Sequence, residues 1–299
     1  MQQQQGVILT RRPYYPASRV LQALWPVWRF ARRQPVGFVS AIIILALVIM
    51  AVIGPSVAPY ESGELTGDRL QAPSLDHPLG TDQVSRDILS RVISGARISL
   101  QVGIAAVALG IGGGAVIGVV SGYLGGRVDT LVQRLMDAML SFPSLVLALS
   151  LAAVMEPGLT TVILAIGVTI LPSANRVVRG STLSIKENVY IEAARSIGAS
   201  DLRIMVFHIV PNLFAVIMVM ISITMGAAII IEASLSFLGL GVQPPSVSWG
   251  EMINSSRIFM EVAPWMVLAP GVAIALVVLS FNLLGDALRD YFDPNLRGR

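Results

Sequence analysis

The sequence has no cysteine, one lysine and few charged residues, and each shortage excludes a class of protein. Without cysteine there is no disulfide framework, no thiol nucleophile and no cysteine-ligated zinc site. A phosphate-binding P-loop requires Gly-Lys-Ser/Thr, but the lysine, Lys186, follows Ile185, so the chain cannot bind ATP through a Walker A motif. Charged residues make up 13% of the chain and hydrophobic residues 54%, whereas a soluble domain carries about 25% charged residues. The composition therefore indicates a membrane protein.

Six segments are long and apolar enough to cross a bilayer, which takes about 20 residues per helix. Pro143 in the third segment and Pro172 in the fourth are expected to kink their helices. The third and fourth segments are separated only by residues 156–158 and should form a hairpin. The sequence predicts an all-α membrane protein with six transmembrane helices, at 36–57, 98–123, 131–155, 159–178, 213–231 and 265–287.

The distribution of positive charge predicts on which side of the membrane each loop lies. When the N-terminus is placed in the cytoplasm, 16 of the 21 Lys and Arg residues lie on the cytoplasmic side, as the positive-inside rule requires. Both termini and the segment 180–212 are then cytoplasmic, while the loops 58–95 and 233–263 are extracytoplasmic. The domain prediction is a cytoplasmic tail over 1–34 followed by a six-helix transmembrane domain over 35–299.

The N-terminal tail has no convincing signal-peptide cleavage site before the first apolar run. Within it, residues 20–30 place two leucines and two tryptophans at helical spacing, with arginines nearby. This pattern is typical of an amphipathic helix that lies on the inner leaflet. A flexible tail with a few aromatic residues is the alternative.

The most informative segment is the polar stretch between the fourth and fifth spans. Residues 192–194 read Glu-Ala-Ala, Gly198 follows after three residues, and a proline stands thirteen residues after the glycine. We expect Asn188 to cap one short helix and Gly198 to end it in the left-handed conformation. Ser200 or Asp201 should cap a second helix. The segment is then a short, rigid projection that transmits a rigid-body motion, which a flexible loop does not.

Three further features each allow two interpretations. Glycines recur every fourth residue on the second span, where they favour either tight helix packing or the moving wall of a pathway; they are Gly110, Gly114, Gly118 and Gly122. Charged residues of the first outside loop form either an ion-pair network or a solvated surface; they are Asp82, Arg86 and Asp87. Glu232 ends the fifth span and is expected to anchor it at the interface rather than contact substrate. His77 has no second histidine or cysteine nearby, so we predict no metal site.

Several longer motifs accompany the Glu-Ala-Ala segment, at 77–82 (His-Pro-Leu-Gly-Thr-Asp), 95–100, 141–143, 236–245 and 282–286. Together they resemble the second membrane subunit of the dipeptide, oligopeptide and nickel ABC importers, the DppC/OppC type. The resemblance covers roughly residues 30–298. Two positions depart from the family pattern, because Ser85 stands where a glycine is usual and Val210 where a leucine is usual.

The resemblance implies a type I ABC importer permease (MetI-like) fold, with five core helices and an additional N-terminal helix. It implies that the Glu-Ala-Ala segment, called the EAA loop, docks ATP-hydrolysing subunits. The matching positions are Tyr190, Glu192, Ala193, Ala194, Arg195, Gly198, Asp201 and Arg203. The implied partners are a homologous permease in a heterodimer, two ATP-binding subunits that hold ATP and Mg, an extracytoplasmic substrate-binding protein and membrane lipid, without nucleic acid. The implied location is a bacterial or archaeal cytoplasmic membrane.

The predicted function is translocation of dipeptides or oligopeptides by alternating access, driven by ATP hydrolysis in separate subunits. The chain itself is predicted to have no catalytic residues and no cofactor. The same type of transporter carrying nickel, glutathione or another small solute is the alternative. Two other classes are a passive channel or scaffold, which needs no docking segment, and an intramembrane enzyme, which needs paired aspartates, a zinc motif or a Ser/His arrangement within the spans. The predicted spans contain none of these enzyme signatures.

Overall fold

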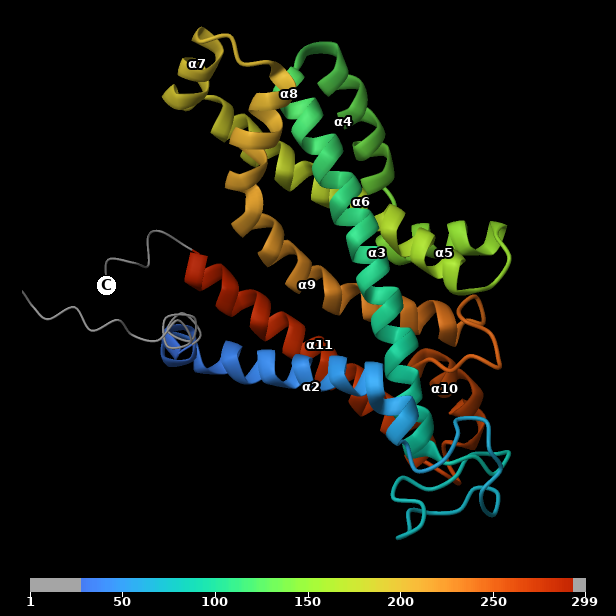
Figure 1. The fold of residues 1–299 in the computed structure, drawn as a ribbon. Coiled ribbons are helices and arrows are strands. Elements are labelled where there is room, and N and C mark those ends of the chain that lie inside the picture. The colour runs from blue at the N-terminus through green and yellow to red at the C-terminus, as the bar shows by residue number, and fades with distance from the viewer. Residues whose placement is uncertain (1–27, 293–299) are drawn as a thin grey trace, which may run out of the picture.

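The computed structural model describes residues 28–292, and every named element in that range is a helix (Figure 1). Residues 28–33 are helical, whereas most of the amphipathic helix expected at 20–30 lies outside the described residues. The long helices are α2 (Pro35–Val57), α3 (Ile88–Leu124), α6 (Leu159–Lys186), α9 (Val210–Phe237) and α11 (Trp265–Phe292). The shorter ones are α4 (Gly126–Leu140), α5 (Ser144–Val154), α7 (Val189–Ser196), α8 (Asp201–Ile204), η1 (Met205–Ile209), α10 (Trp249–Ser256) and η2 (Arg257–Phe259).

The five long helices are apolar enough to cross a membrane, and the pair α4 and α5 provides a sixth crossing if it is counted as one span. The two helices of that pair are bent by 91° relative to each other. The kink expected at Pro143 in the segment 131–155 is therefore a complete break between two helices. Pro143 has no backbone N–H and disfavours helical geometry in the residue before it, and the chain leaves the helix at 141–143.

The helices extend beyond the apolar segments of the sequence, into three segments that are predicted to lie outside the membrane. Helix α3 begins inside the predicted loop 58–95, because the Asp87 side chain caps it by accepting a hydrogen bond from the backbone N–H of Ser90 at 2.7 Å. Helix α9 extends into the start of the predicted loop 233–263, and this loop also contains α10 and η2. In the segment 180–212, α6 occupies the first residues and α9 the last ones. A nucleated helix adds polar residues readily, so polarity alone does not mark its end.

Apart from α4 and α5, the short helices lie at opposite ends of the long ones (Figure 1). At one end, residues 187–209, which we call the knob, hold α7, α8 and η1 between α6 and α9. At the other end, residues 58–87 and 238–264, which we call the cap, hold α10 and η2 beside the start of α3. Helix α3 therefore joins the cap to the knob.

The packing of α3 against α6 depends on the glycine row Gly110, Gly114, Gly118 and Gly122, all of which are buried. A Cβ atom at Gly114 would lie 2.6 Å from the Cβ of Ala174 and 2.7 Å from the carbonyl oxygen of Leu171. A Cβ atom at Gly118 would lie 2.8 Å from the carbonyl oxygen of Asn175. The two backbones approach this closely only because no side chain separates them. The row is thus the surface on which α3 packs against α6.

A fully buried carboxyl group lies where α3, α9 and α10 meet. Glu232 of α9 is 0% exposed, and it accepts hydrogen bonds from the hydroxyls of Ser236 at 2.9 Å and of Ser99 in α3 at 3.4 Å. The Ser99 hydroxyl oxygen accepts a further hydrogen bond from the backbone N–H of Trp249, the first residue of α10, at 3.2 Å. The prediction that Glu232 is an interfacial anchor is therefore wrong, since an anchor would reach water or lipid headgroups. The carboxyl group instead joins the cap to two spans.

We predict that Gly114→Ala destabilises the protein by about 1–3 kcal/mol, because the added methyl group overpacks the α3–α6 contact. Gly112→Ala is the matched control in the same helix, since a Cβ atom there meets nothing within 4 Å and alanine favours a helix over glycine by about 1 kcal/mol. Thermal unfolding of the detergent-purified protein should give a lower midpoint for the first variant only. Equal midpoints for both variants would contradict the packing argument.

We also predict that Glu232→Ala destabilises the protein by about 1–3 kcal/mol, because it leaves the buried hydroxyls of Ser99 and Ser236 without their acceptor. Glu232→Gln keeps an acceptor oxygen in nearly the same volume, so it should lose less than half as much. Denaturant unfolding of the purified protein measures both losses. Wild-type stability in the alanine variant would show that this polar junction does not hold the cap.

Candidate functional site

The knob has an apolar core that fixes it to the transmembrane helices. Ile191 and Ala194, three residues apart, share one face of α7. Both are buried, in one cluster with Ile204, with Ile209 and with Val119 of α3. The knob is therefore packed against α3 rather than suspended on flexible linkers, and a force applied to it reaches the spans.

Gly198 ends α7 in the left-handed conformation, as the sequence predicts. Its φ angle is +83°, a region that residues with a side chain rarely adopt. The backbone N–H of Gly198 donates to the carbonyl oxygen of Arg195 at 2.9 Å, and that of Ala199 donates to the carbonyl oxygen of Ala194 at 3.1 Å. These two bonds form a Schellman motif, which satisfies carbonyls at the helix end. The bend that separates α7 from α8 is thus fixed by backbone geometry.

The predicted side-chain caps of the knob helices are wrong. Asn188 precedes α7, but its amide donates to the carbonyl oxygen of Ile185 at 2.9 Å instead of capping α7. Because the last carbonyls of α6 have no intrahelical partner, they are the nearest acceptors for this amide. Ser200 precedes α8 without a side-chain capping bond, and Asp201 uses its carboxylate to bind α3.

Tyr123, at the end of α3, binds three parts of the knob region. Its hydroxyl donates to Asp201 Oδ1 at 2.7 Å. The guanidinium of Arg195 lies over its ring, 5.2 Å from the centroid, where a cation is attracted by the aromatic face. Its carbonyl oxygen accepts a hydrogen bond from Lys186 Nζ at 2.7 Å. The sequence analysis did not identify Tyr123; an aromatic hydroxyl at the end of a long apolar span is the signal that marks it.

The outward surface of the knob carries the remaining predicted docking residues. Glu192, Ala193 and Arg203 are exposed, and no side chain among the described residues pairs with the Glu192 carboxylate or the Arg203 guanidinium. Tyr190 is 44% exposed, and its hydroxyl accepts a hydrogen bond from Asn212 Nδ2 at 3.4 Å. Of the eight predicted residues, Ala194 is buried and therefore supports the knob from inside.

Exposed apolar side chains surround these polar groups. Ile197, Leu202 and Phe207 are 87%, 68% and 71% exposed. A hollow of about 680 Å³ opens beside α8 and η1, lined by Ser200, Leu202, Arg203, Val206, Phe207 and His208. A cluster of exposed apolar residues around a hollow is typical of a protein–protein contact surface. The sequence analysis missed Leu202 and Phe207, because they lie in a segment whose overall polarity predicts a surface exposed to water.

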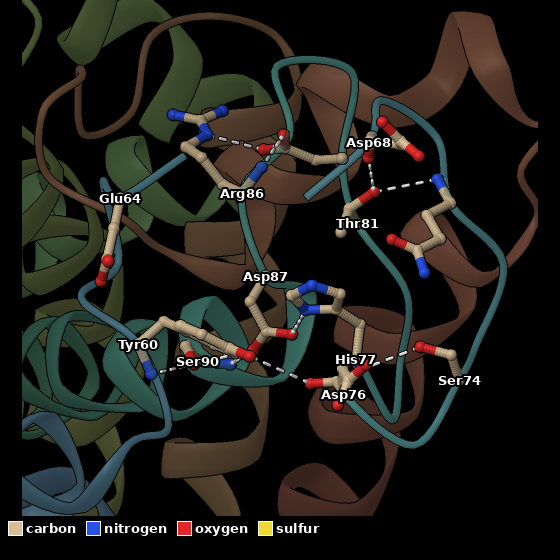
Figure 2. Close-up of polar contacts among 12 residues, drawn as sticks. Tyr60, Glu64, Asp68, Ser74, Asp76, His77, Thr81, Arg86, Asp87 and Ser90 are labelled. Atoms are coloured by element: carbon tan, nitrogen blue, oxygen red, sulfur yellow. Dashed lines mark hydrogen bonds and ion pairs between the residues drawn. The ribbon is translucent and has the colours of Figure 1, made fainter. Parts of the chain in front are cut away.

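In the cap, the three predicted charged residues form two neighbouring clusters (Figure 2). Asp82 Oδ2 lies 2.7 Å from Arg86 Nε, and Asp82 Oδ1 accepts the backbone N–H of Arg86 at 2.9 Å. Asp87 does not join this pair, because its Oδ1 lies 2.9 Å from His77 Nδ1 while its Oδ2 caps α3. The buried His77 ring also lies 5.2 Å from the Tyr60 ring. His77 therefore stabilises the first part of the cap, residues 58–87.

Arg91, which the sequence analysis missed, connects the two halves of the cap. Its side chain is buried, its Nη2 lies 3.1 Å from Glu251 Oε2 of α10, and its Nη1 donates to the carbonyl oxygen of Ser62 at 3.1 Å. Asp82 Oδ2 lies 3.7 Å from Arg91 Nε. Burial raises the pKa of the Glu251 carboxyl, and the positive charge of Arg91 opposes that shift. Within residues 28–292, no group of three or more acids and histidines is placed to hold a metal ion.

Comparison with known proteins agrees with this architecture. Residues 114–298 match the family described as binding-protein-dependent transport system inner membrane component. Residues 24–73 match the N-terminal TM domain of oligopeptide transport permease C. The fold is similar to that of a chain in an inward-facing structure of the MetNI methionine ABC transporter, with a TM-score of 0.57 at 18% identity, over 69% of this chain and 98% of that chain.

The relatives are similar along almost the whole sequence. Glutathione transport system permease protein GsiD of Shigella boydii serotype 4 (strain Sb227) is 41% identical over 293 residues, which are 97% of each chain. GsiD of Escherichia coli O6:K15:H31 (strain 536 / UPEC) is 43% identical over 292 residues, 97% of this chain and 96% of the relative. The chain therefore belongs to the binding-protein-dependent transport system inner membrane components, as a multi-pass permease subunit of an ABC importer of the dipeptide and oligopeptide type.

Proposed function

We propose that this protein is one of two permease subunits of an ATP-driven importer for short peptides. A homologous permease completes the passage, two ATP-binding subunits that hold ATP and Mg dock on the knob, and an extracytoplasmic binding protein delivers cargo at the cap. The observation that carries the proposal is the knob itself, which has a buried apolar core and exposed apolar side chains around its polar groups. A passive channel has no need for such a surface.

We place the knob and both termini in the cytoplasm and the cap outside. The support is the distribution of positive charge, since 16 of 21 Lys and Arg residues then lie inside. The knob end carries Arg195 and Arg203, which are exposed there. In this orientation the knob faces the compartment where ATP is available.

The knob is connected to three spans, so its displacement changes their arrangement. Helix α6 leads into it at Lys186, and a helical run from Asp201 to Phe237 continues out of it as α9. The third connection is the hydrogen bond between Asp201 and Tyr123 of α3. When the ATP-binding subunits close and reopen, the knob moves as a rigid body and the spans tilt with it. The passage is then open to one side at a time, which is alternating access.

The cargo that we favour is glutathione or another peptide of similar size. Both named relatives are glutathione permeases, and each covers almost the full length of this chain. Glutathione is itself a short peptide with two carboxylates, so it fits the peptide class predicted from the sequence. The match of residues 24–73 to an oligopeptide permease domain supports the same class.

We predict that the complex, reconstituted in vesicles with its sibling permease, ATP-binding subunits and binding protein, accumulates radiolabelled glutathione only when ATP is supplied. Omitting the ATP-binding subunits should abolish accumulation, because this chain has no P-loop. A dipeptide and nickel, tested in the same vesicles, measure cargo preference. Glutathione entry without ATP or without those subunits would identify a passive channel instead.

We predict that Phe207→Asp reduces both retention of the ATP-binding subunits and ATP-driven uptake by about tenfold or more, as expected when a central apolar contact is lost. Phe207 is exposed, so the substitution should not unfold the chain. Ile258→Asp is the matched control, since Ile258 is 77% exposed at the cap end. Co-purification of the ATP-binding subunits should be normal in the control, because Ile258 lies at the end away from the knob. Full subunit retention by the Phe207 variant would exclude the knob as the docking surface.

A further inference from the structure

One face of α3 is left uncovered by the described part of the chain. Its exposed residues follow each other at intervals of three or four, which places them along one side of the helix. They are Arg97, Gln101, Ile104, Ala108, Gly112 and Val116. This face is distinct from the glycine row that packs on α6, so α3 has both a packed side and a free side.

Three hollows follow the uncovered face of α3. The first, about 480 Å³, lies between α2 and α3 beside Arg97. The second, about 520 Å³, shares Val48 and Ile104 with the first and is bounded also by α9 and α11. The third, about 260 Å³, shares Ile217 with the second and reaches Leu202 in the knob. Because neighbouring hollows share lining residues, they lie in a row along α3 from the cap side to the knob, and we call this row the trough.

Arg97 carries a positive charge within this largely apolar trough. Its guanidinium forms no hydrogen bond or ion pair with any described residue, whereas Arg91 and Arg179 are paired with acids. It lies about 13 Å along α3 from the start of that helix, at 1.5 Å per residue. Val48 and Val52 of α2, the helix with the highest mean hydropathy among the spans, 3.1, line the same hollow. Arg97 therefore lies at the cap-side end of the apolar part of α3, next to apolar residues of α2.

A charge beside the apolar side chains of two spans is unfavourable unless it faces water or an opposite charge, and such residues mark the paths of substrates. The hollow beside Arg97 is open and no described residue pairs with its guanidinium, so a bound molecule can supply the opposite charge. A guanidinium offers two parallel N–H donors that match a carboxylate. Gln101, one turn further along α3 and lining the same hollow, adds an amide that both donates and accepts hydrogen bonds. Together the Arg97 guanidinium and the Gln101 amide can bind the terminal carboxylate of a peptide.

We propose that Arg97 and Gln101 bind the carboxylate of a peptide cargo at the cap-side entrance of the trough, and that the uncovered face of α3 lines the passage. This inference rests on the proposed importer function, because it assigns the cargo of that function to named residues. A lipid phosphate offers the same anionic chemistry. We favour the cargo, because the trough continues from Arg97 along α3 as far as the knob.

The first test uses the absence of cysteine from the chain. In the assembled transporter, single cysteines from Ile104→Cys and Gly112→Cys should react with a charged, membrane-impermeant methanethiosulfonate reagent, because a passage holds water. Val272→Cys is the matched control, since Val272 is 64% exposed on α11 and lines none of the three hollows; it should not react. Unreactive cysteines at both trough positions would show that lipid or the partner permease covers this face. That result would overturn the proposal, as would equal reaction of the control.

The second test separates cargo binding from packing. With radiolabelled glutathione as the probe, Arg97→Gln should raise the KM for ATP-driven uptake by about tenfold, the effect of losing a charge-assisted hydrogen bond, while uptake at saturating glutathione changes little. Arg97→Lys keeps the charge and should recover most of the affinity. A KM unchanged in the Gln variant, or raised equally in both variants, would overturn the assignment.

Vesicle composition distinguishes the two sources of negative charge. The effect of Arg97→Gln should be equal in vesicles of phosphatidylcholine alone and in vesicles that contain phosphatidylglycerol. A defect confined to the anionic vesicles would assign Arg97 to lipid phosphate and overturn the proposal. If the wild-type complex shows no ATP-dependent glutathione uptake, the proposed importer function fails, and cysteine reactivity still decides whether the trough holds water.

Discussion

The close approach of α3 and α6 is the constraint on which the rest of the structure depends. Because the glycine row lets the two backbones touch, the pair forms one rigid unit. Lys186, at the end of α6, reinforces it by donating to the carbonyl oxygen of Tyr123 at the end of α3. On another side of α6, Arg179 binds Asp129 of α4 through two hydrogen bonds, at 2.6 and 2.5 Å. A knob mounted on such a unit is displaced with the spans rather than independently of them.

Helix α3 connects the cap to the knob as one rigid element. It has 37 residues and is therefore about 55 Å long, whereas the hydrocarbon core of a bilayer is about 30 Å thick. Helix α3 is thus longer than the apolar layer is thick. One end holds α10 through Arg91 and Ser99, and the other holds α8 through Tyr123. A helix cannot shorten without losing hydrogen bonds, so movement at the knob is carried to the cap by the same rigid element.

The sequence predicts the elements of this protein better than the contacts between them. Spans, the knob and the turn at Gly198 follow from local patterns: apolar length, polarity and a residue without a side chain. The Arg91–Glu251 and Tyr123–Asp201 contacts join residues 160 and 78 positions apart, and no local pattern encodes such pairs. Glu232 was misassigned because one of its hydrogen-bond donors, Ser99, lies on another helix, 133 positions away in the sequence. Ser85 has a φ angle of 70°, so it adopts a conformation that favours glycine, and the bonds around Asp82 hold the turn in place.

The two faces of α3 show how helical phase, rather than composition, decides the role of a small residue. Gly112 and Gly114 are two positions apart, which places them about 200° apart around the helix axis. A Cβ atom at Gly114 would collide with α6, whereas one at Gly112 would meet open space. Small residues on the packed side of α3 let the backbone of α6 come close. Small residues on the free side of α3 leave the trough wide. Because a rigid helix presents both faces at once, any tilt that preserves the α3–α6 contact necessarily moves the wall of the trough.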